Sequence, residues 1–169
     1  PTQVSRGVAT HGRVRIFGQD KDDSVTLARD AKVGDSQLVL KASPEGWKVG
    51  DKLVLGGTSR NENGSHADNS KFQDAELTIT SIKGNIVEFT NDDIKSPSGN
   101  KVLRFDHVRP EGYADKLNLY VANTTRNVSI STRDADQVPV QQRGHTMFMH
   151  NPDVIVQNAG FYDLGRTDK

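Results

Sequence analysis

AELTITSIKGNIVEFT, residues 75–90, is the stretch that decides the fold class of this chain. Polar and apolar side chains alternate along it on both sides of the KGN triplet at 83–85. A period of two places alternate side chains on one face of a strand, and a short glycine-containing triplet forms a tight turn. The stretch therefore predicts a β-hairpin, whose apolar residues are Leu77, Ile79 and Ile82 before the turn and Ile86 and Phe89 after it.

The rest of the chain repeats the short apolar runs of this hairpin. Gly, Asp, Asn, Ser and Pro separate the runs, and none of them continues with helical spacing over three turns. This pattern is typical of an all-β protein. The predicted strands are 12–18, 24–28, 36–41, 51–57, 75–84, 85–90, 101–108, 117–122, 127–131, 145–150 and 153–162.

The composition limits the class of function. Hydrophobic residues make up 33% of the chain and the mean hydropathy is −0.66, which suits strands that bury only one face. Lys+Arg and Asp+Glu both total 22, and there is no sustained basic run that would indicate nucleic-acid binding. No stretch approaches the roughly 18 apolar residues of a membrane span. The absence of cysteine excludes disulfides and thiolate zinc sites.

The tetrapeptide KVGD occurs twice, at 32–35 and at 48–51, and an LVL run follows each copy. A Gly-Asp turn that leads into a strand accounts for both. We interpret them as two similar hairpins rather than as an internal repeat. Trp47, immediately before the second copy, is expected to fill one end of a barrel or sandwich.

Residues 56–76 form a long polar segment between strands, and loops of this length are uncommon unless they are functional. The NENGSHAD run within it has the composition of a calcium loop but lacks the ligand spacing and the final glutamate of an EF-hand. We interpret the segment as a solvated loop. Calcium is the one cofactor that the sequence suggests.

Several phrases occur along the chain in one order. Together they resemble the eight-glycine extracellular domain and the start of the parallel β-helix that follows it. Proteins with this arrangement include the cell-migration-inducing hyaluronan-binding protein, the cell-surface hyaluronidase, the fibrocystin-like receptors and bacterial secreted relatives. The phrases are WKVGDKLVL (47–55), AELTITSIKGNIVEF (75–89), FDH (105–107), TRNVSI (125–130), RGHTMFMH (143–150) and AGFYDLGRTDK (159–169).

The resemblance extends from about His11 to Lys169, and the polar segment at 56–76 has no counterpart in it. It implies a secreted, extracellular or cell-surface module that recognises an acidic polysaccharide. In the animal members the implied activity is hyaluronan binding or depolymerisation.

We therefore expect a β-sandwich or barrel-like region over residues 1–114, packed on the first coils of a right-handed parallel β-helix over residues 115–169. One continuous structural unit is the alternative. The offset of 26 residues from Val128 to Val154 is compatible with one coil. Asn151 and Asn158 would suit coil corners.

An exposed strand edge is expected after Lys169. It predicts either self-association or contact with the remainder of a longer chain, of which this sequence would be a fragment.

RGHTMFMHN, residues 143–151, is the least typical part of the sequence. Strand alternation puts His145 and both methionines on one face, and Phe148 and His150 on the other. Since both faces are apolar, this strand should be covered on both sides. The two histidines should not share one metal ion. The alternative role for each is a bond to a neighbouring carbonyl or carboxylate inside a packed β structure.

Two routes of glycan cleavage supply the candidate catalytic groups. Hydrolysis needs two carboxyl groups about 5–10 Å apart, and Asp106, Asp153 and Asp163 lie nearest the motif-bearing strands. Elimination needs a base and a cation beside the uronate carboxylate, which a histidine and Arg166 would supply; the alternative for Arg166 is an Arg–Asp pair that holds a turn. The candidate catalytic residues are His145, Asp163 and Arg166, and the candidate substrate-binding residues are His107, Arg126, Arg143 and His150.

Two functions from different classes follow. One is recognition of an acidic polysaccharide, with or without its cleavage by hydrolysis or elimination. The other is a structural or adhesive β-helix module without catalytic activity. A groove with an arginine, a histidine and a carboxylate within the span of a sugar ring would favour the first. Internal pairing of all such groups would favour the second.

Overall fold

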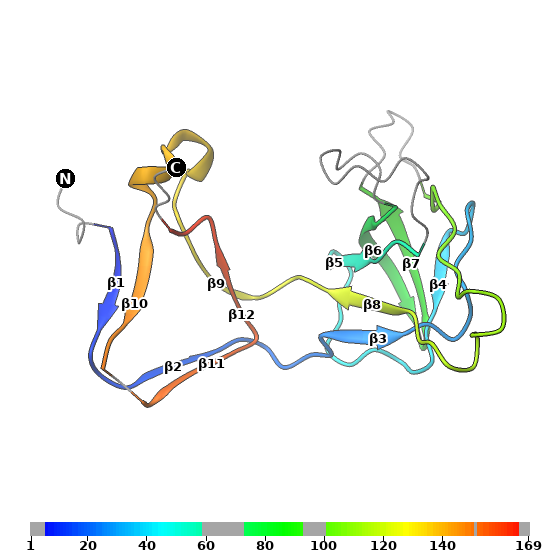
Figure 1. Cartoon of the computed structure of the whole chain (residues 1–169), viewed down its shortest axis with the longest axis horizontal. Helices are drawn as coiled ribbons and strands as arrows, with labels where there is room; N and C mark the ends of the chain where they lie inside the picture. The colour runs from blue at the N-terminus through cyan, green and yellow to red at the C-terminus, as the bar shows by residue number, and fades with distance from the viewer. Residues whose placement is uncertain (1–5, 59–72, 93–100, 151, 166–169) are drawn as a thin grey trace. The chain divides into compact units, whose positions relative to one another are not determined.

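The computed structural model describes residues 6–58, 73–92, 101–150 and 152–165 (Figure 1). Its elements are β-strands and two short 3-10 helices, η2 (Ala135–Gln137) and η3 (Val140–Gln142), so the predicted all-β fold is confirmed. The chain divides into two compact units, and each is described by itself. Unit 1 consists of residues 1–20 and 126–169, and unit 2 consists of residues 21–125.

Unit 2 is built on a six-stranded antiparallel sheet in the order β3-β8-β5-β6-β7-β4 (Figure 1). The sheet curls into a half-barrel, and a bridge between Leu27 and Leu40 joins its two edges. Two backbone hydrogen bonds of 2.8 Å, from Ala28 to Val39 and from Lys41 to Thr26, reinforce this bridge. The strands are β3 (Ser24–Thr26), β4 (Gln37–Val39), β5 (Lys52–Leu55), β6 (Ala75–Lys83), β7 (Ile86–Asn91) and β8 (Tyr120–Asn123).

The predicted hairpin is confirmed as β6 and β7, and it supplies much of the core. The turn residue Gly84 has φ 61, a conformation that glycine adopts without strain. The ladder shifts between Ile79 and Ser81, and this bulge explains why the next inward apolar residue is Ile82. The fully buried side chains of the hairpin include Leu77, Ile79, Val87 and Phe89. They pack with leucines from β4 and β5.

Both KVGD copies form the same turn and dock in the same way. Gly34 and Gly50 have φ 88 and 92, and in each copy the aspartate carboxylate accepts from the lysine N–H, at 3.0 and 3.1 Å. In each copy the glycine N–H and the aspartate carbonyl also form hydrogen bonds with the backbone of one residue outside the turn. This residue is Leu103 in the first copy and Ile79 in the second. A Gly-Asp turn before a strand is therefore present in both copies. The interpretation of two similar hairpins is wrong for the second copy, because β4 and β5 on either side of it do not pair with each other.

The prediction of a strand over residues 101–108 is wrong. That segment makes one isolated bridge, from His107 to Ala31, and Leu103 bonds to the first KVGD turn. Its backbone hydrogen bonds thus go to Ala31 and to the turn that directly follows Ala31, and they do not form a continuous ladder.

Unit 1 contains three pairs of parallel strands (Figure 1). β1 (Gly7–Thr10) pairs with β10 (His145–Phe148), β2 (Val14–Phe17) with β11 (Val154–Gln157), and β9 (Val128–Ser131) with β12 (Ala159–Tyr162). β1, β2 and β9 follow one another along the chain, and their partners β10, β11 and β12 follow one another in the same order. The single strand predicted at 153–162 is instead two strands, β11 and β12, which are separated by Asn158 with a φ of 54.

This arrangement differs from the expected boundary between residues 114 and 115. β8 lies beyond that boundary but belongs to unit 2, whereas β1 and β2 lie before it and pair with C-terminal strands. Val128 pairs with Ala159 and not with Val154, whose partner is Val14. Unit 2 is therefore inserted in the chain between β2 and β9.

Unit 1 by itself does not cover both faces of the strand predicted at 145–150. Met147 is 38% exposed, and Gly160 is the only buried residue among those that the structure describes in unit 1. β10 pairs with β1, a strand that the sequence did not predict because GVAT is short and made of small residues.

Gly18 marks a corner of unit 1 with no room for a side chain. A Cβ at this position would lie 1.8 Å from the Asn158 carbonyl oxygen, whereas one at Gly12 would have its nearest neighbour, Thr10 Oγ1, at 3.8 Å. We expect Gly18→Ala to lower the free energy of unfolding by about 1–3 kcal/mol and Gly12→Ala to have no such effect. Urea denaturation and hydrogen exchange of the β2 and β11 amides measure this. Equal stability of the two variants would contradict the close approach at Gly18.

Candidate functional site

A pocket of about 780 Å³ lies in unit 1, beside the end of β9 and the starts of β1 and β10. The parallel pairing brings these strand ends together, although they come from opposite ends of the chain. Val8, Ile130, Val138 and Leu164 supply its apolar wall. The polar side chains that line it are Arg6, Ser131, Thr132, Arg133, Asp134, Gln137 and His145.

The hydroxyl of Thr132 holds the wall of the pocket together. It accepts a hydrogen bond from the Gly144 N–H at 3.0 Å and donates one to the Asp163 carbonyl at 2.5 Å. Gly165 N–H in turn donates to the Gly144 carbonyl at 2.9 Å. One side chain therefore connects the segment after β9, the start of β10 and the segment after β12.

His145 lines the pocket at the start of β10. Its backbone N–H donates to the Arg6 carbonyl at 3.3 Å. A Cβ on Gly7 would lie 2.2 Å from the His145 carbonyl oxygen and 3.2 Å from its Nδ1, so the missing side chain of Gly7 lets the two segments meet. Nδ1 is buried and has no hydrogen-bond partner among the described residues.

The charged groups at the pocket are mainly cationic. Arg6 is exposed, and its guanidinium donates to the Gln142 carbonyl at 3.4 Å. The side chain of Arg133 is 95% exposed and lies 3.5 Å from the Asp134 carboxylate, a surface pair that both partners can leave at small cost. Two arginines, a histidine and one carboxylate thus share this pocket.

The predicted catalytic residues do not lie at one place in the structure. His145 lines the pocket, but Asp163 does not, and its carboxylate lies 3.4 Å from Arg143 Nη1. Arg166 lies outside the described residues. The three predicted residues therefore do not form one cluster in the described part of the chain.

The prediction of His107 as a substrate-binding residue is wrong. His107 is fully buried in unit 2, where its Nδ1 lies 2.9 Å from the Gly56 carbonyl oxygen. It matches the alternative of a histidine bonded to a carbonyl inside a packed β structure.

The other predicted binding residues lie outside the pocket lining. His150 is exposed and stacks on His11, with ring centroids 5.7 Å apart. Arg143 precedes the pocket residue Gly144 and faces Asp163. Arg126 is half-buried at the start of the C-terminal part of unit 1.

The remaining candidate carboxylates are engaged in structural contacts. Asp106 accepts the Val33 N–H at 2.8 Å. Asp153 forms ion pairs with Arg13 at 2.6 Å and with Arg15 at 2.5 Å. Neither lines the pocket.

Within the described residues, no three His, Asp or Glu side chains are grouped so that they would hold a metal ion. Most of the polar segment at 56–76, including its calcium-like run, lies outside the described residues. The described part of the chain contains no helix with the length and hydrophobicity needed to cross a membrane.

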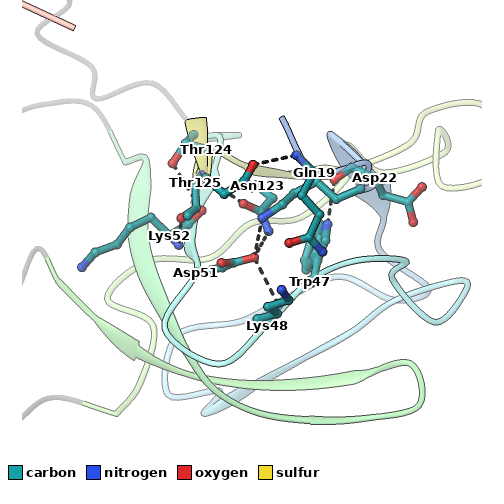
Figure 2. Close-up of polar contacts among 11 residues, drawn as sticks. Gln19, Asp22, Trp47, Lys48, Asp51, Lys52, Asn123, Thr124 and Thr125 are labelled. Carbon is teal, nitrogen blue, oxygen red and sulfur yellow. Dashed lines mark hydrogen bonds and ion pairs between the residues drawn. The ribbon is translucent and has the colours of Figure 1, made fainter. Parts of the chain in front are cut away.

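A second polar cluster is buried in unit 2, at the second KVGD turn. Asp51 Oδ2 accepts hydrogen bonds from Lys21 Nζ at 2.9 Å, from Asn123 Nδ2 at 2.7 Å and from the Lys48 N–H at 3.1 Å. Figure 2 shows the bonds from the labelled Lys48 and Asn123 to the Asp51 carboxylate. Lys21 and Asp51 expose only 4% and 9% of their side chains. No local pattern in the sequence indicates this cluster.

The Asp51 carboxyl remains ionised despite its burial. Burial by itself would raise its pKa, but the hydrogen bonds from Lys21, Asn123 and the Lys48 backbone, together with the charge of Lys21, outweigh this effect and hold the pKa below its usual value. The nearby indole of Trp47 is also buried and donates to the Asp22 carbonyl at 2.7 Å (Figure 2).

The pocket residues Arg6 and Arg133 were also missed by the sequence analysis. The only local signal was the polar TRD run at 132–134, directly after a predicted strand. Arg6 carries no signal, because its place beside His145 depends on the pairing of β1 with β10.

Comparisons with known proteins do not assign this chain to a family. Neither the protein-family models nor the curated proteins give a match to this sequence. Among solved structures, the tailspike gp61 of the Pseudomonas phage phi297 is similar over 87% of this chain, with 15% sequence identity and a TM-score of 0.37. The chain spans 22% of the length of that protein. A likeness of this strength supports neither a fold nor a function for the chain.

Proposed function

We propose that this chain is a secreted or cell-surface module that recognises an acidic polysaccharide through the pocket in unit 1. The observation that carries the proposal is the set of Arg6, Arg133, His145 and Asp134 around one pocket of about 780 Å³. An arginine, a histidine and a carboxylate in one groove are the groups that favour recognition of an acidic glycan over a purely structural role. The volume is in the range of pockets that enclose a small organic ligand.

The chemistry of the pocket suits a uronate sugar. A guanidinium binds a carboxylate through two parallel N–H donors, which gives both charge and geometry. Ser131 and Gln137 add donors and acceptors for sugar hydroxyls. The exposed Arg133 can leave Asp134 and turn to a ligand, because a solvated pair of this kind contributes little stability.

The architecture of unit 1 is part of the same proposal. β1, β2 and β9 would be one coil of a right-handed parallel β-helix, and β10, β11 and β12 would be the next. The parallel pairing of the three strand pairs in matching order supports this interpretation. Unit 2 would then be the eight-glycine-like domain, inserted in the first coil.

Binding to a glycan panel tests the proposal. We expect the chain to bind hyaluronan or polygalacturonate, but not neutral dextran, in calorimetric titrations with and without calcium. Each charge-assisted hydrogen bond contributes about 1.5–3 kcal/mol, so the double variant Arg6→Ala, Arg133→Ala should bind about tenfold or more weakly. The matched control is Arg29→Ala, Arg104→Ala, which removes two exposed positive charges from unit 2 and should leave binding unchanged.

Three outcomes separate the alternatives. Equal weakening in both double variants would mean that net charge, and not the pocket, determines binding. No binding to any glycan would leave the structural or adhesive module as the function. Shortening of the glycan, followed by size-exclusion chromatography and abolished by His145→Ala, would add depolymerisation to recognition.

A further inference from the structure

We infer that Lys21 and Asn123 of unit 2 form an intramolecular amide cross-link, for which Asp51 transfers the protons. This inference is independent of glycan binding, because the three residues lie in unit 2 and the proposed binding pocket lies in unit 1. The amide would be a covalent bond in a chain that has no cysteine with which to form a disulfide.

The three side chains have the chemistry that the bond requires. A lysine amine is a nucleophile once it is neutral, a side-chain amide carbon is an electrophile, and a carboxylate between them can accept and return protons. Asp51 Oδ2 contacts both nitrogens, at 2.9 Å from Lys21 Nζ and 2.7 Å from Asn123 Nδ2. The nucleophile and the leaving group therefore meet at one oxygen atom.

The surroundings hold these groups in place and away from water. Lys21 exposes 4% of its side chain and Asp51 9%, and Asn123 is 1% exposed as a residue. Backbone hydrogen bonds join their segments, from Asn123 to Asp23 at 2.8 Å and from Thr124 to Lys52 at 2.9 Å. Such fixed placement removes much of the entropic barrier to a reaction between two groups.

One further contact favours attack on Asn123. Its side-chain oxygen accepts a hydrogen bond from the Thr125 N–H at 3.0 Å. Negative charge develops on this oxygen when the amine adds to the amide carbon. A backbone N–H that already points at it stabilises that charge without reorganisation.

The reaction balances without any external reagent. The Lys21 ammonium gives a proton to the Asp51 carboxylate, and the neutral Nζ adds to Cγ of Asn123. Asp51 returns its proton to the departing Nδ2 and takes one from Nζ, so that the Cγ–Nδ2 bond breaks and ammonia leaves. Ammonia removes the last proton from Asp51 as ammonium. The products are one new Nζ–Cγ amide and one ammonium ion, with the total charge unchanged.

The location of the bond gives it a consequence for the fold. Lys21 is the first residue of unit 2, and Asn123 lies near its last residue, Thr125. The amide would close unit 2 at the two points where the chain enters and leaves it. Tension applied along the chain through unit 1 would then bypass unit 2, and unit 2 would remain a closed loop when denatured.

Mass spectrometry of the purified full chain tests the inference. We expect the denatured wild type to be lighter than its sequence by the mass of one ammonia molecule, and Lys21→Arg to have its full sequence mass. Because an amide at Lys21 blocks tryptic cleavage there, the digest should contain peptide 16–29 joined to peptide 117–126. The matched control, Lys48→Arg, changes a lysine whose backbone N–H donates to Asp51, a bond that the substitution keeps, and should retain the cross-link.

Other results would overturn the assignment. A full-mass wild type with cleavage after Lys21 would mean that no bond forms. Loss of water, with peptide 16–29 joined to peptide 49–52, would place the bond at Asp51 instead. Loss of ammonia inside peptide 117–126 alone would be cyclisation of Asn123 and not a cross-link. These masses do not depend on glycan binding, so either proposal can fail without the other.

Discussion

Asp51→Asn is expected to lower the free energy of unfolding by about 3–5 kcal/mol, because it removes one partner of a buried ion pair and leaves the other charge uncompensated. The charge left behind is the Lys21 ammonium, whose side chain is 4% exposed and lies 2.9 Å from Asp51. In a cross-linked wild type Lys21 Nζ is an uncharged amide and this ion pair is absent. Asp51→Asn then loses the stabilisation that closing a long loop gives and leaves Lys21 as a buried ammonium without a partner. Urea denaturation followed by the fluorescence of the single tryptophan, Trp47, measures it.

The first KVGD turn supplies the matched control. Asp35 makes the same bond to its own turn, from the Lys32 N–H at 3.0 Å, but its ion pair with Arg29 is solvated, with 26% and 48% of the side chains exposed. We expect Asp35→Asn to cost about 1 kcal/mol or less. Equal losses at Asp35 and Asp51 would show that the turn, and not the buried pair, is what the aspartates stabilise.

The pH dependence of this difference follows from the direction of the pKa. The Asp51 carboxyl has a lower pKa in the folded chain than in the unfolded chain, because hydrogen bonds from Lys21 and Asn123 outweigh its burial. Its contribution to stability is therefore fully present above the unfolded pKa of about 3.9. It is lost as the pH falls through the folded pKa. The stability difference between wild type and Asp51→Asn should thus be constant near neutral pH and shrink below about pH 4.

Phe89→Ala is expected to destabilise unit 2 by about 3–5 kcal/mol, because it leaves a cavity in a close-packed core. Phe89 is 2% exposed on β7, pairs with Ile79 across the hairpin and belongs to the same buried cluster as Trp47. The tryptophan therefore reports directly on the loss of this core. Urea denaturation gives the difference in free energy.

Val49→Ala is the control for this substitution. Val49 is 65% exposed at the tip of the second KVGD turn, and its truncation should change stability by less than about 0.5 kcal/mol. Were Phe89→Ala to unfold at the same urea concentration as Val49→Ala, the hairpin would not carry the core of unit 2.

The candidate site was only partly accessible from the sequence. His145 was identified from the RGHTMFMH phrase, and it does line the pocket. Its neighbours Arg6 and Arg133 were not, because no local pattern relates a residue before β1 to one after β9. The prediction for His107 was wrong because its contact with the Gly56 carbonyl and its burial depend on the folded chain.

Local sequence patterns by themselves determined the all-β fold class of this protein. Alternation with a period of two predicted the β6–β7 hairpin, and the KVGD repeats predicted two Gly-Asp turns, because these features depend on neighbouring residues alone. Tertiary structure alone decided the rest. The pairing of β1 and β2 with β10 and β11, the pocket at their ends and the Lys21–Asp51–Asn123 cluster join residues far apart in the chain. Strand periodicity shows which face of a strand is apolar, but it does not identify the distant strand or side chain that the fold brings to it.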